Sequence, residues 1–315
     1  MEDYDYIYNG NVGNWIKFAN TLRLRLAMRI SYVDQTKAET EAKAAIDHSI
    51  GLMTSVSDNA VLKQSVSFSF INEWWEAYES FNDFRMSATM DCYLKGLQDP
   101  RLAAYFKVAK KDGEYHGVRN GQTSRSQGTL SEAASSMNVG QASSILWMDA
   151  AETYFLLAEA KLRLNLGDKT VKEYYEEGVK TSFSSKGASG AESYLDNDVN
   201  VPSISFIDPT NGRNTDVSRM VSNLTVKWDE SVSDDKKLER IMVQKWIALF
   251  PDGQEAWSEM RRTGYPGIVT INTNASGGEV ATGELISRLK FPTKEYSDNG
   301  ENTQAAVSLL NGTDI

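Results

Sequence analysis

The sequence of 315 residues has few of the residues on which many catalytic and metal sites depend. It contains one cysteine, Cys92, and two histidines, His48 and His116. A single cysteine cannot form a disulfide within the chain, and without a CxxC pair beside a histidine no zinc site is expected. Phosphate-binding glycine loops, dinucleotide fingerprints and a G-x-S-x-G nucleophile motif are also missing. We therefore predict no cofactor and no metal.

Clustered positive charge and long apolar runs are missing as well. The chain has 33 basic against 43 acidic residues, a net charge of −10, and no basic block stands out. Nucleic acid is therefore not an expected partner. No apolar run is long enough to span a bilayer, and the acidic start lacks the basic and apolar regions of a signal peptide. Hydrophobic residues still make up 41% of the chain, which suffices for a substantial core.

Helical periodicity predicts two helix hairpins. Residues 15–30 carry apolar side chains at the spacing of an amphipathic helix, and a T-x-x-E capping box precedes a second helix at 36–46 with small alanines on one face. The same pattern returns at 151–162, followed by a second capping box and helix at 170–179. The later pair resembles a tetratricopeptide-type repeat. We predict that these non-tandem hairpins stack in a mostly α fold.

The segments between and after the hairpins have weaker patterns. Residues 73–93 suit a helix, whereas 110–144 and 184–232 are poor in apolar residues and are predicted to be long loops, the second with short strands. Residues 269–286 suit a β-hairpin turning at a Gly-Gly pair. No linker divides the sequence, so we predict a single domain over residues 1–315.

The stretch from Leu238 to Pro266 has the strongest core signature in the chain. Ser233 and the acidic residues after it suit a helix N-terminus, and around Trp246 apolar side chains cover nearly the whole circumference. A helix of this kind is buried on all sides, so we predict that Trp246 is deeply buried. A turn at 251–253 leads to a second short helix, and we expect its arginines and glutamates to form buried ion pairs.

Five segments spread along the chain carry long motifs of unusual composition. They read YNGNVGNWIKFANTLRLRLAMRIS from Tyr8, DPRL at 99–102, YHGVRNG from Tyr115, QKWIALFPDGQEAW followed by RRTGYP from Gln244, and RLKFPTKEYSDNGENTQAAV from Arg288. Together these motifs resemble the SusD/RagB family of surface nutrient-binding lipoproteins in Bacteroidetes-type outer membranes. The matched segments extend from Tyr8 to about Val307.

The resemblance implies a SusD-like fold, mostly α, with tetratricopeptide-type helix hairpins plus a large irregular, loop-rich region. It also implies a cell-surface protein that captures a glycan or other nutrient, performs no catalysis and delivers the ligand to a TonB-dependent SusC-type outer-membrane transporter. In the family, the lipid-bearing cysteine follows a signal peptide. Because Cys92 lies far inside the chain, we predict that it carries no lipid. This chain would then be the C-terminal portion of a longer, lipid-anchored precursor.

Two groups of aromatic and polar residues are candidates for ligand binding. Adjacent tryptophans on a helix cannot both face one core, so at least one of Trp74 and Trp75 is expected at the surface or at an interface. The polar loop at 115–120 joins aromatic rings, which stack on sugars, to groups that bond hydroxyls. The candidate ligand-binding residues are Trp74, Trp75, Tyr78, Tyr115, His116, Arg119 and Asn120. The tryptophans assigned to core packing are Trp15, Trp147, Trp246 and Trp257.

Other interpretations of the same residues stay open. The loop at 115–120 also fits an ordinary surface loop. Glu255 and Glu259 fit the carboxylate pair of a glycoside hydrolase, although ion pairs with nearby arginines are favoured. A helical-repeat scaffold that binds peptides is a third function, and the non-tandem hairpins argue against it. The residues at 196–200 imitate the start of a calcium loop through Asp196, Asp198 and Asn200, but its glycine and distal glutamate are missing.

Overall fold

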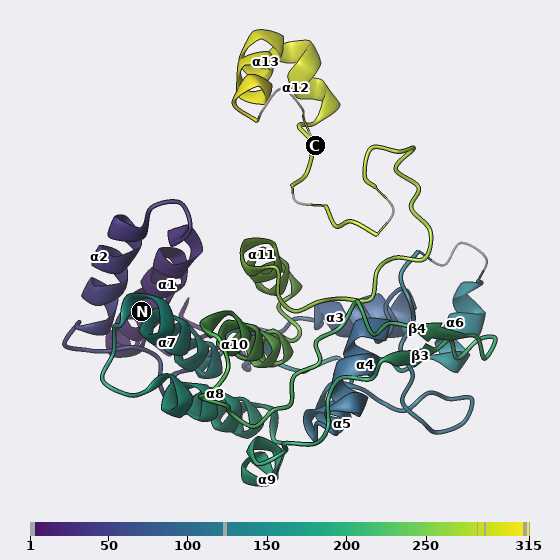
Figure 1. Cartoon of the computed structure of the whole chain (residues 1–315), viewed down its shortest axis with the longest axis horizontal. Helices are drawn as coiled ribbons and strands as arrows, with labels where there is room; N and C mark the ends of the chain where they lie inside the picture. Colours follow the sequence, from purple (N-terminus) through teal and green to yellow (C-terminus); the bar gives the residue numbers. More distant parts are fainter. Residues whose placement is uncertain (1–3, 122–124, 282, 287, 311–313, 315) are drawn as a thin grey trace. The chain divides into compact units, whose positions relative to one another are not determined.

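The computed structural model describes residues 4–121, 125–281, 283–286, 288–310 and 314. Their structure is mostly helical with short two-stranded antiparallel sheets, which confirms the predicted fold class (Figure 1). The chain forms two compact units. The first is Met1–Val118 with Arg125–Val269, and the second is Arg119–Ser124 with Thr270–Ile315.

The first predicted hairpin consists of α1, Val12–Ile30, and α2, Gln35–Ile46. Helix α2 begins earlier than its capping box predicted, because Asp34 rather than Thr36 supplies the capping oxygen, accepting a hydrogen bond from the Lys37 N–H at 2.9 Å. The α2 residues Ala38, Ala42 and Ala45 have no exposed surface. Their small side chains let α2 lie close against α1, as the sequence predicted.

The second predicted hairpin consists of α7, Ala150–Leu164, and α8, Val171–Lys186. Its capping box is confirmed: Thr170 Oγ1 accepts from the Glu173 N–H at 3.2 Å, and Glu173 Oε2 accepts from the Thr170 N–H at 2.7 Å. Gly178 of α8 faces Phe155 of α7, where an added Cβ would lie 2.8 Å from the ring. Helix α7 also contacts α1 and α10, so the two hairpins pack together through α7.

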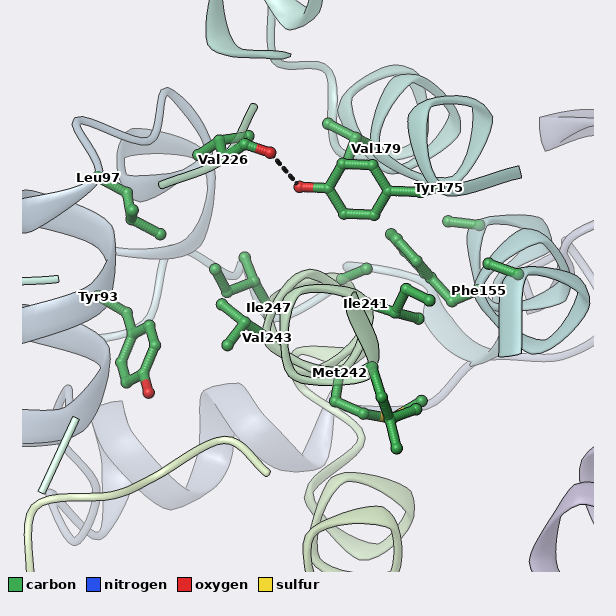
Figure 2. Packing of buried hydrophobic residues seen from close by; sticks show 14 of the residues in the cluster. Tyr93, Leu97, Phe155, Tyr175, Val179, Val226, Ile241, Met242, Val243 and Ile247 are labelled. Carbon is green, nitrogen blue, oxygen red and sulfur yellow. Dashed lines mark hydrogen bonds between the residues drawn. The ribbon is translucent and has the colours of Figure 1, made fainter. Parts of the chain in front are cut away.

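Helix α10, Asp234–Leu249, runs through the main core of the first unit, which it shares with α4, Ala88–Gly96, and the second hairpin. In Figure 2, Ile241 points toward Phe155 and Tyr175, which come from α7 and α8. On another side of α10, Ile247 points toward α4, the helix that carries Tyr93. None of these five side chains is exposed. Full burial of one such side chain contributes about 1.5–3 kcal/mol.

The burial of Trp246 in α10 differs from the prediction. The prediction of deep burial is wrong: the indole is half-buried and lies 5.5 Å from the ring of Tyr93. Phe250, which follows the last residue of α10, is also half-buried and lies beside the rings of Tyr105 and Phe106. The apolar pattern around the whole helix was correct, but neighbouring elements cover Trp246 incompletely.

Charged side chains from α1, α7, α10 and α11, Gly253–Thr263, form a buried ion network. They are Arg25, Arg29, Glu152, Glu159, Lys245, Glu255, Glu259 and Arg262. Lys245 Nζ, for example, lies 3.1 Å from Glu259 and 3.7 Å from Glu152. Each charge therefore faces charges of opposite sign, which burial of ions requires. The predicted buried ion pairs are confirmed.

The connections between the hairpins contain short elements. They are η2 Val56–Asp58, β1 Ala60–Leu62, α3 Glu73–Trp75, η3 Glu76–Ser80, α5 Arg101–Tyr105, α6 Gln127–Ala133, β2 Ile145–Met148, α9 Ala191–Leu195, β3 Ser205–Ile207 and β4 Asn214–Asp216. Strand β1 pairs with β2, and β3 with β4, both antiparallel. The short strands expected within 184–232 are thus present. The helix predicted over 73–93 is interrupted after Ser80 and resumes at Ala88.

The second unit contains α12, Thr293–Asp298, and α13, Gly300–Leu309, which contact each other. The β-hairpin predicted over 269–286 is wrong, since its described residues contain turns and no strand. In this segment, hydrogen bonds between side chains and the backbone take the place of hydrogen bonds between strands. Asn274 Nδ2 donates to the Val280 carbonyl at 2.6 Å, and Ser276 Oγ accepts from the Val280 N–H at 3.0 Å. Short polar side chains of this kind compete with strand pairing for backbone groups.

Candidate functional site

Asn72 fixes the start of α3 and thereby the position of Trp74. Its Oδ1 accepts from the backbone N–H groups of Trp74 and Trp75 at 3.0 and 3.2 Å, which caps the helix. Its Nδ2 donates to the Ser143 carbonyl at 3.1 Å, so the same side chain ties α3 to the segment before β2. Trp74 is left 38% exposed and Trp75 half-buried. The expectation that at least one of these rings reaches the surface is met by Trp74.

Trp74 lines a cavity of about 220 Å³. The other lining residues are Asn72, Ala104, Tyr105, Met137, Asn138, Val139, Ser143, Ser144, Ile145, Leu146, Lys186, Phe250 and Pro251. The cavity is smaller than the range of about 300–1,000 Å³ typical of drug-sized ligands. Its size and mixed lining suit one ring-sized group that has both an apolar face and polar substituents.

Polar groups at this cavity can bind such substituents. Asn138 Nδ2 donates to the Ala103 carbonyl at 3.2 Å. Lys186 Nζ donates to the Phe250 carbonyl at 3.1 Å and lies 3.4 Å from Asp149 Oδ2. Burial lowers the pKa of Lys186, while the Asp149 carboxylate opposes that shift. The lysine thus brings a poorly solvated donor to the cavity lining.

Tyr78 supports the cavity wall instead of facing a ligand. It lies in η3, a π-helical turn, and only 2% of it is exposed. Its hydroxyl donates to the carbonyl of Val139, a lining residue, at 2.8 Å and accepts from Lys107 Nζ at 3.2 Å. The predicted ligand role of Tyr78 therefore becomes a positioning role, because the ring cannot be reached from solvent without displacing its neighbours.

Two further aromatic rings are exposed just after η3. Phe81 and Phe84 are 60% and 55% exposed, and the Phe84 ring lies edge-on to Trp74 with centroids 6.1 Å apart. Exposed large apolar side chains that gather in one place mark interaction surfaces more often than scattered ones do. The segment 72–84 therefore presents an aromatic surface beside the cavity.

A family model described as "Susd and RagB outer membrane lipoprotein", SusD-like, matches residues 1–315. The chain belongs to the SusD-like family. Among solved structures, it resembles a chitin-binding SusD homologue from Flavobacterium johnsoniae, with 39% sequence identity, a TM-score of 0.91, and coverage of 99% of this chain and 64% of the homologue. It also resembles a SusD homologue from Bacteroides uniformis, with 38% identity, a TM-score of 0.90, and coverage of 100% and 65%.

This SusD-like chain therefore spans about 64–65% of the length of these two homologues. A third homologue, from Bacteroides thetaiotaomicron, is 36% identical with a TM-score of 0.88, and the match covers 97% of this chain and 64% of that one. The comparison with curated proteins found no match. No helix in the described part of the chain is both long and apolar enough to cross a membrane.

Two of the motifs that carry the resemblance, DPRL and the C-terminal signature, meet in the core of the SusD-like chain. Arg101 of the DPRL motif has no exposed surface. Its guanidinium donates to Asp99, to Ser182 Oγ at 2.9 Å and to Gln244 Oε1 at 2.7 Å. Gln244 opens the C-terminal signature, so two motifs 143 residues apart in sequence meet in the core. Buried contacts of this kind hold distant segments of the fold together.

No residue of the loop at 115–120 lines the Trp74 cavity. Tyr115 is half-buried and packs against the main core. His116 Nε2 lies 2.9 Å from Asp112 Oδ2. Arg119 and Asn120 belong to the second unit, where Arg119 Nε donates to the Thr270 carbonyl at 2.7 Å. Asn120 is exposed and its carbonyl accepts from the Asn272 N–H at 2.7 Å.

Sequence reasoning missed Trp147 and Asn138. Trp147 was assigned to core packing, but it lies in strand β2 and is 49% exposed, so that assignment is wrong. A signal existed in the run Ile145–Met148, because two-residue alternation places only every second side chain of a strand in the core. Asn138 carried no local signal, since only the packing of its loop brings it to the cavity.

The other cavities and carboxylate groups give weaker support for a binding site than the Trp74 cavity does. A groove of about 640 Å³ lies along α2 and the α7–α8 turn, where Tyr174 is buried. A cavity of about 390 Å³ includes Asp198 and Asn200 of the calcium-like sequence, but Asp198 pairs with Lys227 at 3.1 Å. Among the described residues, no three His, Cys, Asp or Glu side chains are grouped so that they could hold a metal ion.

The two glutamates considered for glycoside hydrolysis are used within the ion network. Arg29 Nη2 lies 2.5 Å from Glu255 and 3.1 Å from Glu259. Burial raises the pKa of Glu255. Burial acts in the same direction on Glu259, but Lys245 and Arg262 outweigh it and hold its pKa below the ordinary value. Neither glutamate lines the Trp74 cavity. Structural ion pairs, which the sequence favoured, account for both residues.

Proposed function

We propose that this chain is the glycan-binding part of a cell-surface nutrient receptor and that the Trp74 cavity holds one sugar ring of the ligand. The exposed Trp74 indole beside a small cavity lined by polar groups is the observation that carries the proposal. Family membership supports the same function. Delivery of the ligand to a SusC-type TonB-dependent transporter, and attachment to the outer membrane by a lipid outside this chain, belong to the same proposal.

The chemistry of a sugar ring matches what this cavity offers. The C–H groups on one face of the ring can stack on the Trp74 indole, which buries apolar surface on both partners. Hydroxyl groups at the ring edge can bond to Asn138, Ser144 and backbone groups of the wall. Binding pockets commonly combine an apolar surface with a few oriented polar groups in this way.

A binding role is favoured over glycoside hydrolysis. A glycosidase needs two carboxyl groups about 5–10 Å apart on either side of the scissile bond. The residues that line the Trp74 cavity include no Asp or Glu. We therefore propose that the bound sugar is released unchanged, and incubation of the purified protein with oligosaccharides should yield no cleaved product.

The test of the proposed function is a glycan and peptide array followed by calorimetry. Chitin oligosaccharides should be included first because one 39% identical homologue is described as chitin-binding. Trp74→Ala should weaken binding of the best glycan by about 1–3 kcal/mol, as for a hot-spot contact, and leave the melting temperature unchanged. Trp257→Ala removes an indole that stacks on Arg261, with the guanidinium 3.8 Å from the ring centroid, and is the matched control.

Three outcomes would contradict this proposal. They are selection of peptides instead of glycans on the array, an unaltered affinity of Trp74→Ala, and equal losses in Trp74→Ala and the Trp257→Ala control. The first would favour a peptide-binding scaffold. Trp75, Tyr115 and His116 in the first unit, and Arg119 and Asn120 in the second, stay separate candidates for ligand contact, and alanine variants of these residues in the same assay decide for each.

A further inference from the structure

Residues 63–70 form a small hairpin, the finger, in the connection between β1 and α3. The Ser65 N–H donates to the Phe68 carbonyl at 2.8 Å, and the Phe68 N–H donates to the Ser65 carbonyl at 3.3 Å. The loop between these two residues is therefore only Val66 and Ser67. Loops of two residues are the commonest tight connection between antiparallel segments. The backbone thus holds Val66 at the tip of a defined turn.

The base of the finger is aromatic. The ring of Phe68 stacks on that of Tyr6, with centroids 4.1 Å apart and planes 16° apart, and lies 5.6 Å from the ring of Phe70. Gln64 Nε2 donates to the Phe70 carbonyl at 2.8 Å, which joins the two arms of the finger. All three rings are half-buried, so each keeps part of its surface in contact with solvent.

The tip of the finger is apolar and its surroundings in the sequence carry almost no charge. Val66 is completely exposed. Between Ala60 and Asn72 the only charged residue is Lys63, in a chain whose net charge is −10. A single exposed valine needs no explanation. An apolar tip above a cluster of aromatic rings, on a stretch without an acidic residue, has the character of an interaction surface.

We propose that the finger enters the interfacial region of a lipid bilayer and gives the protein a direct contact with the membrane surface. The family is described as outer membrane lipoproteins, so a bilayer is the surface within reach. Aromatic rings such as those of Tyr6, Phe68 and Phe70 favour the membrane–water interface. Anionic lipids attract Lys63 and repel acidic surfaces, so an approach through this stretch is favoured over the rest of an acidic chain.

The finger and a lipid anchor have complementary roles. One acyl chain binds a membrane only marginally, and stable attachment takes two signals. The finger buries too little apolar surface to hold the protein on a membrane by itself. Once an anchor keeps the protein at the surface, the finger fixes which side faces the bilayer. This inference goes beyond glycan binding and does not depend on the Trp74 cavity.

The test tethers this chain through a histidine tag to vesicles of phosphatidylcholine and phosphatidylglycerol with a small share of a nickel-chelating lipid. Ser67→Cys places an environment-sensitive fluorophore beside Val66, and the buried Cys92 escapes labelling. The emission should become stronger and shift to shorter wavelength on the vesicles, and lipids with a quencher in their acyl chains should quench it. The same label at Val33→Cys, where the valine is 90% exposed between α1 and α2, should show none of these changes.

A second set of variants changes Val66 and keeps the label at Ser67→Cys. A charged group is unfavourable within the bilayer, so Val66→Asp should abolish the response to vesicles and leave the melting temperature unchanged. Val66→Leu should enlarge the response.

The inference is overturned if the label beside Val66 does not respond to vesicles, if it responds no more than the label at Val33→Cys, or if the response survives in Val66→Asp. A response to the best glycan in place of the vesicles would also overturn it, because the finger would then belong to the ligand surface. Failure of the chain to bind any glycan would refute the proposed function and leave the vesicle result standing.

Discussion

The guanidinium of Arg262 and the carboxylate of Glu159 face each other in a fork-to-fork arrangement. Two parallel hydrogen bonds join Nη1 to Oε1 at 2.6 Å and Nη2 to Oε2 at 2.7 Å, across 103 residues of sequence. Their side chains are 5% and 0% exposed. This pair fastens α11, in the C-terminal signature, to α7 of the second hairpin, and bidentate pairs of this kind are the stronger class of charged hydrogen bonds.

Removal of Arg262 should destabilise the fold strongly. Arg262→Ala leaves Glu159 buried beside Arg163 alone and deprives Glu259 of one partner, so we expect a loss of about 3–5 kcal/mol in the free energy of unfolding. Urea denaturation measures it. The matched control is Arg23→Ala, because Arg23 pairs with Glu41 at the surface with side chains 44% and 29% exposed. That change should cost at most about 1 kcal/mol. Equal losses in the two variants would refute the argument.

Arg101 is a second buried cation, and the loss of unfolding free energy on its removal can be measured. Its ion pair with Asp99 is 2.6 Å long and neither side chain is exposed. Arg101→Met keeps much of the volume but leaves the Asp99 carboxylate unpaired, so we expect a loss of about 3–5 kcal/mol. Replacing both partners, as in Arg101→Met with Asp99→Leu, should recover part of it. Calorimetric unfolding of the three proteins decides, and a parental melting temperature for Arg101→Met would contradict the expectation.

Trp246 and Tyr93 are in contact, and we expect Tyr93, the smaller of the two, to contribute more to the free energy of unfolding. Tyr93 is fully buried, and its hydroxyl donates to the Gly267 carbonyl at 2.9 Å and accepts from the Ser222 N–H at 3.0 Å. Tyr93→Ala should therefore cost about 3–5 kcal/mol. The half-buried Trp246 should cost about 1–3 kcal/mol when changed to alanine. Chemical denaturation of both variants tests this order, and the reverse order would show that Trp246 is covered in solution.

We expect the ionised carboxylate of Asp5 to stabilise the fold and this contribution to be lost in acid. Burial alone would raise the pKa of Asp5, but hydrogen bonds from the Tyr8 N–H, the Trp15 indole and the Gly10 N–H lower it from 3.8 to about 2. A lowered folded pKa means that stability is gained above the unfolded pKa of about 3.9 and lost as pH falls toward 2.

The variant Asp5→Asn isolates this contribution. Denaturation at several pH values should show a constant stability difference between parent and variant above about pH 4, and this difference should shrink as pH approaches 2. A difference that does not change with pH would mean that the Asp5 carboxylate contributes through its shape and not through its charge.

The thiol of Cys92 should not react with reagents while the protein is folded. It lies in α4 with 1% exposure, and burial, together with the Asp91 carboxylate, raises the pKa of its thiol to about 12. Because the thiolate is the reactive form, a thiol reagent at pH 8 should label Cys92 only after denaturation. Mass spectrometry of the native membrane-extracted protein should find no acyl group on its peptide. Rapid labelling of the native protein would contradict the buried placement.

The sequence alone determined the features that depend on local periodicity and composition. The two helix hairpins, the Thr170 capping box and the buried α10 follow from apolar spacing and from helix-end chemistry, which act over a few residues. The buried ion pairs were also predictable, because arginines and glutamates crowd an apolar signature where they could be buried only as pairs. Two of the motifs that indicated the family, DPRL and the C-terminal signature, supply residues of this interior.

Only the tertiary structure decided which side chains reach the surface and which meet. Trp246 and Trp147 show this most clearly. The first occupies an apolar helix yet is half-buried, because neighbouring elements cover it incompletely. The second was expected in the core and is exposed, because Met148, its neighbour on β2, is the residue that enters the core, and Trp147 is left out of the β1–β2 register. Whether a side chain is buried depends on which distant segments pack against it. Such segments can be far apart in sequence: Asn72 and Ser143 are separated by 71 residues, and Arg101 and Gln244 by 143.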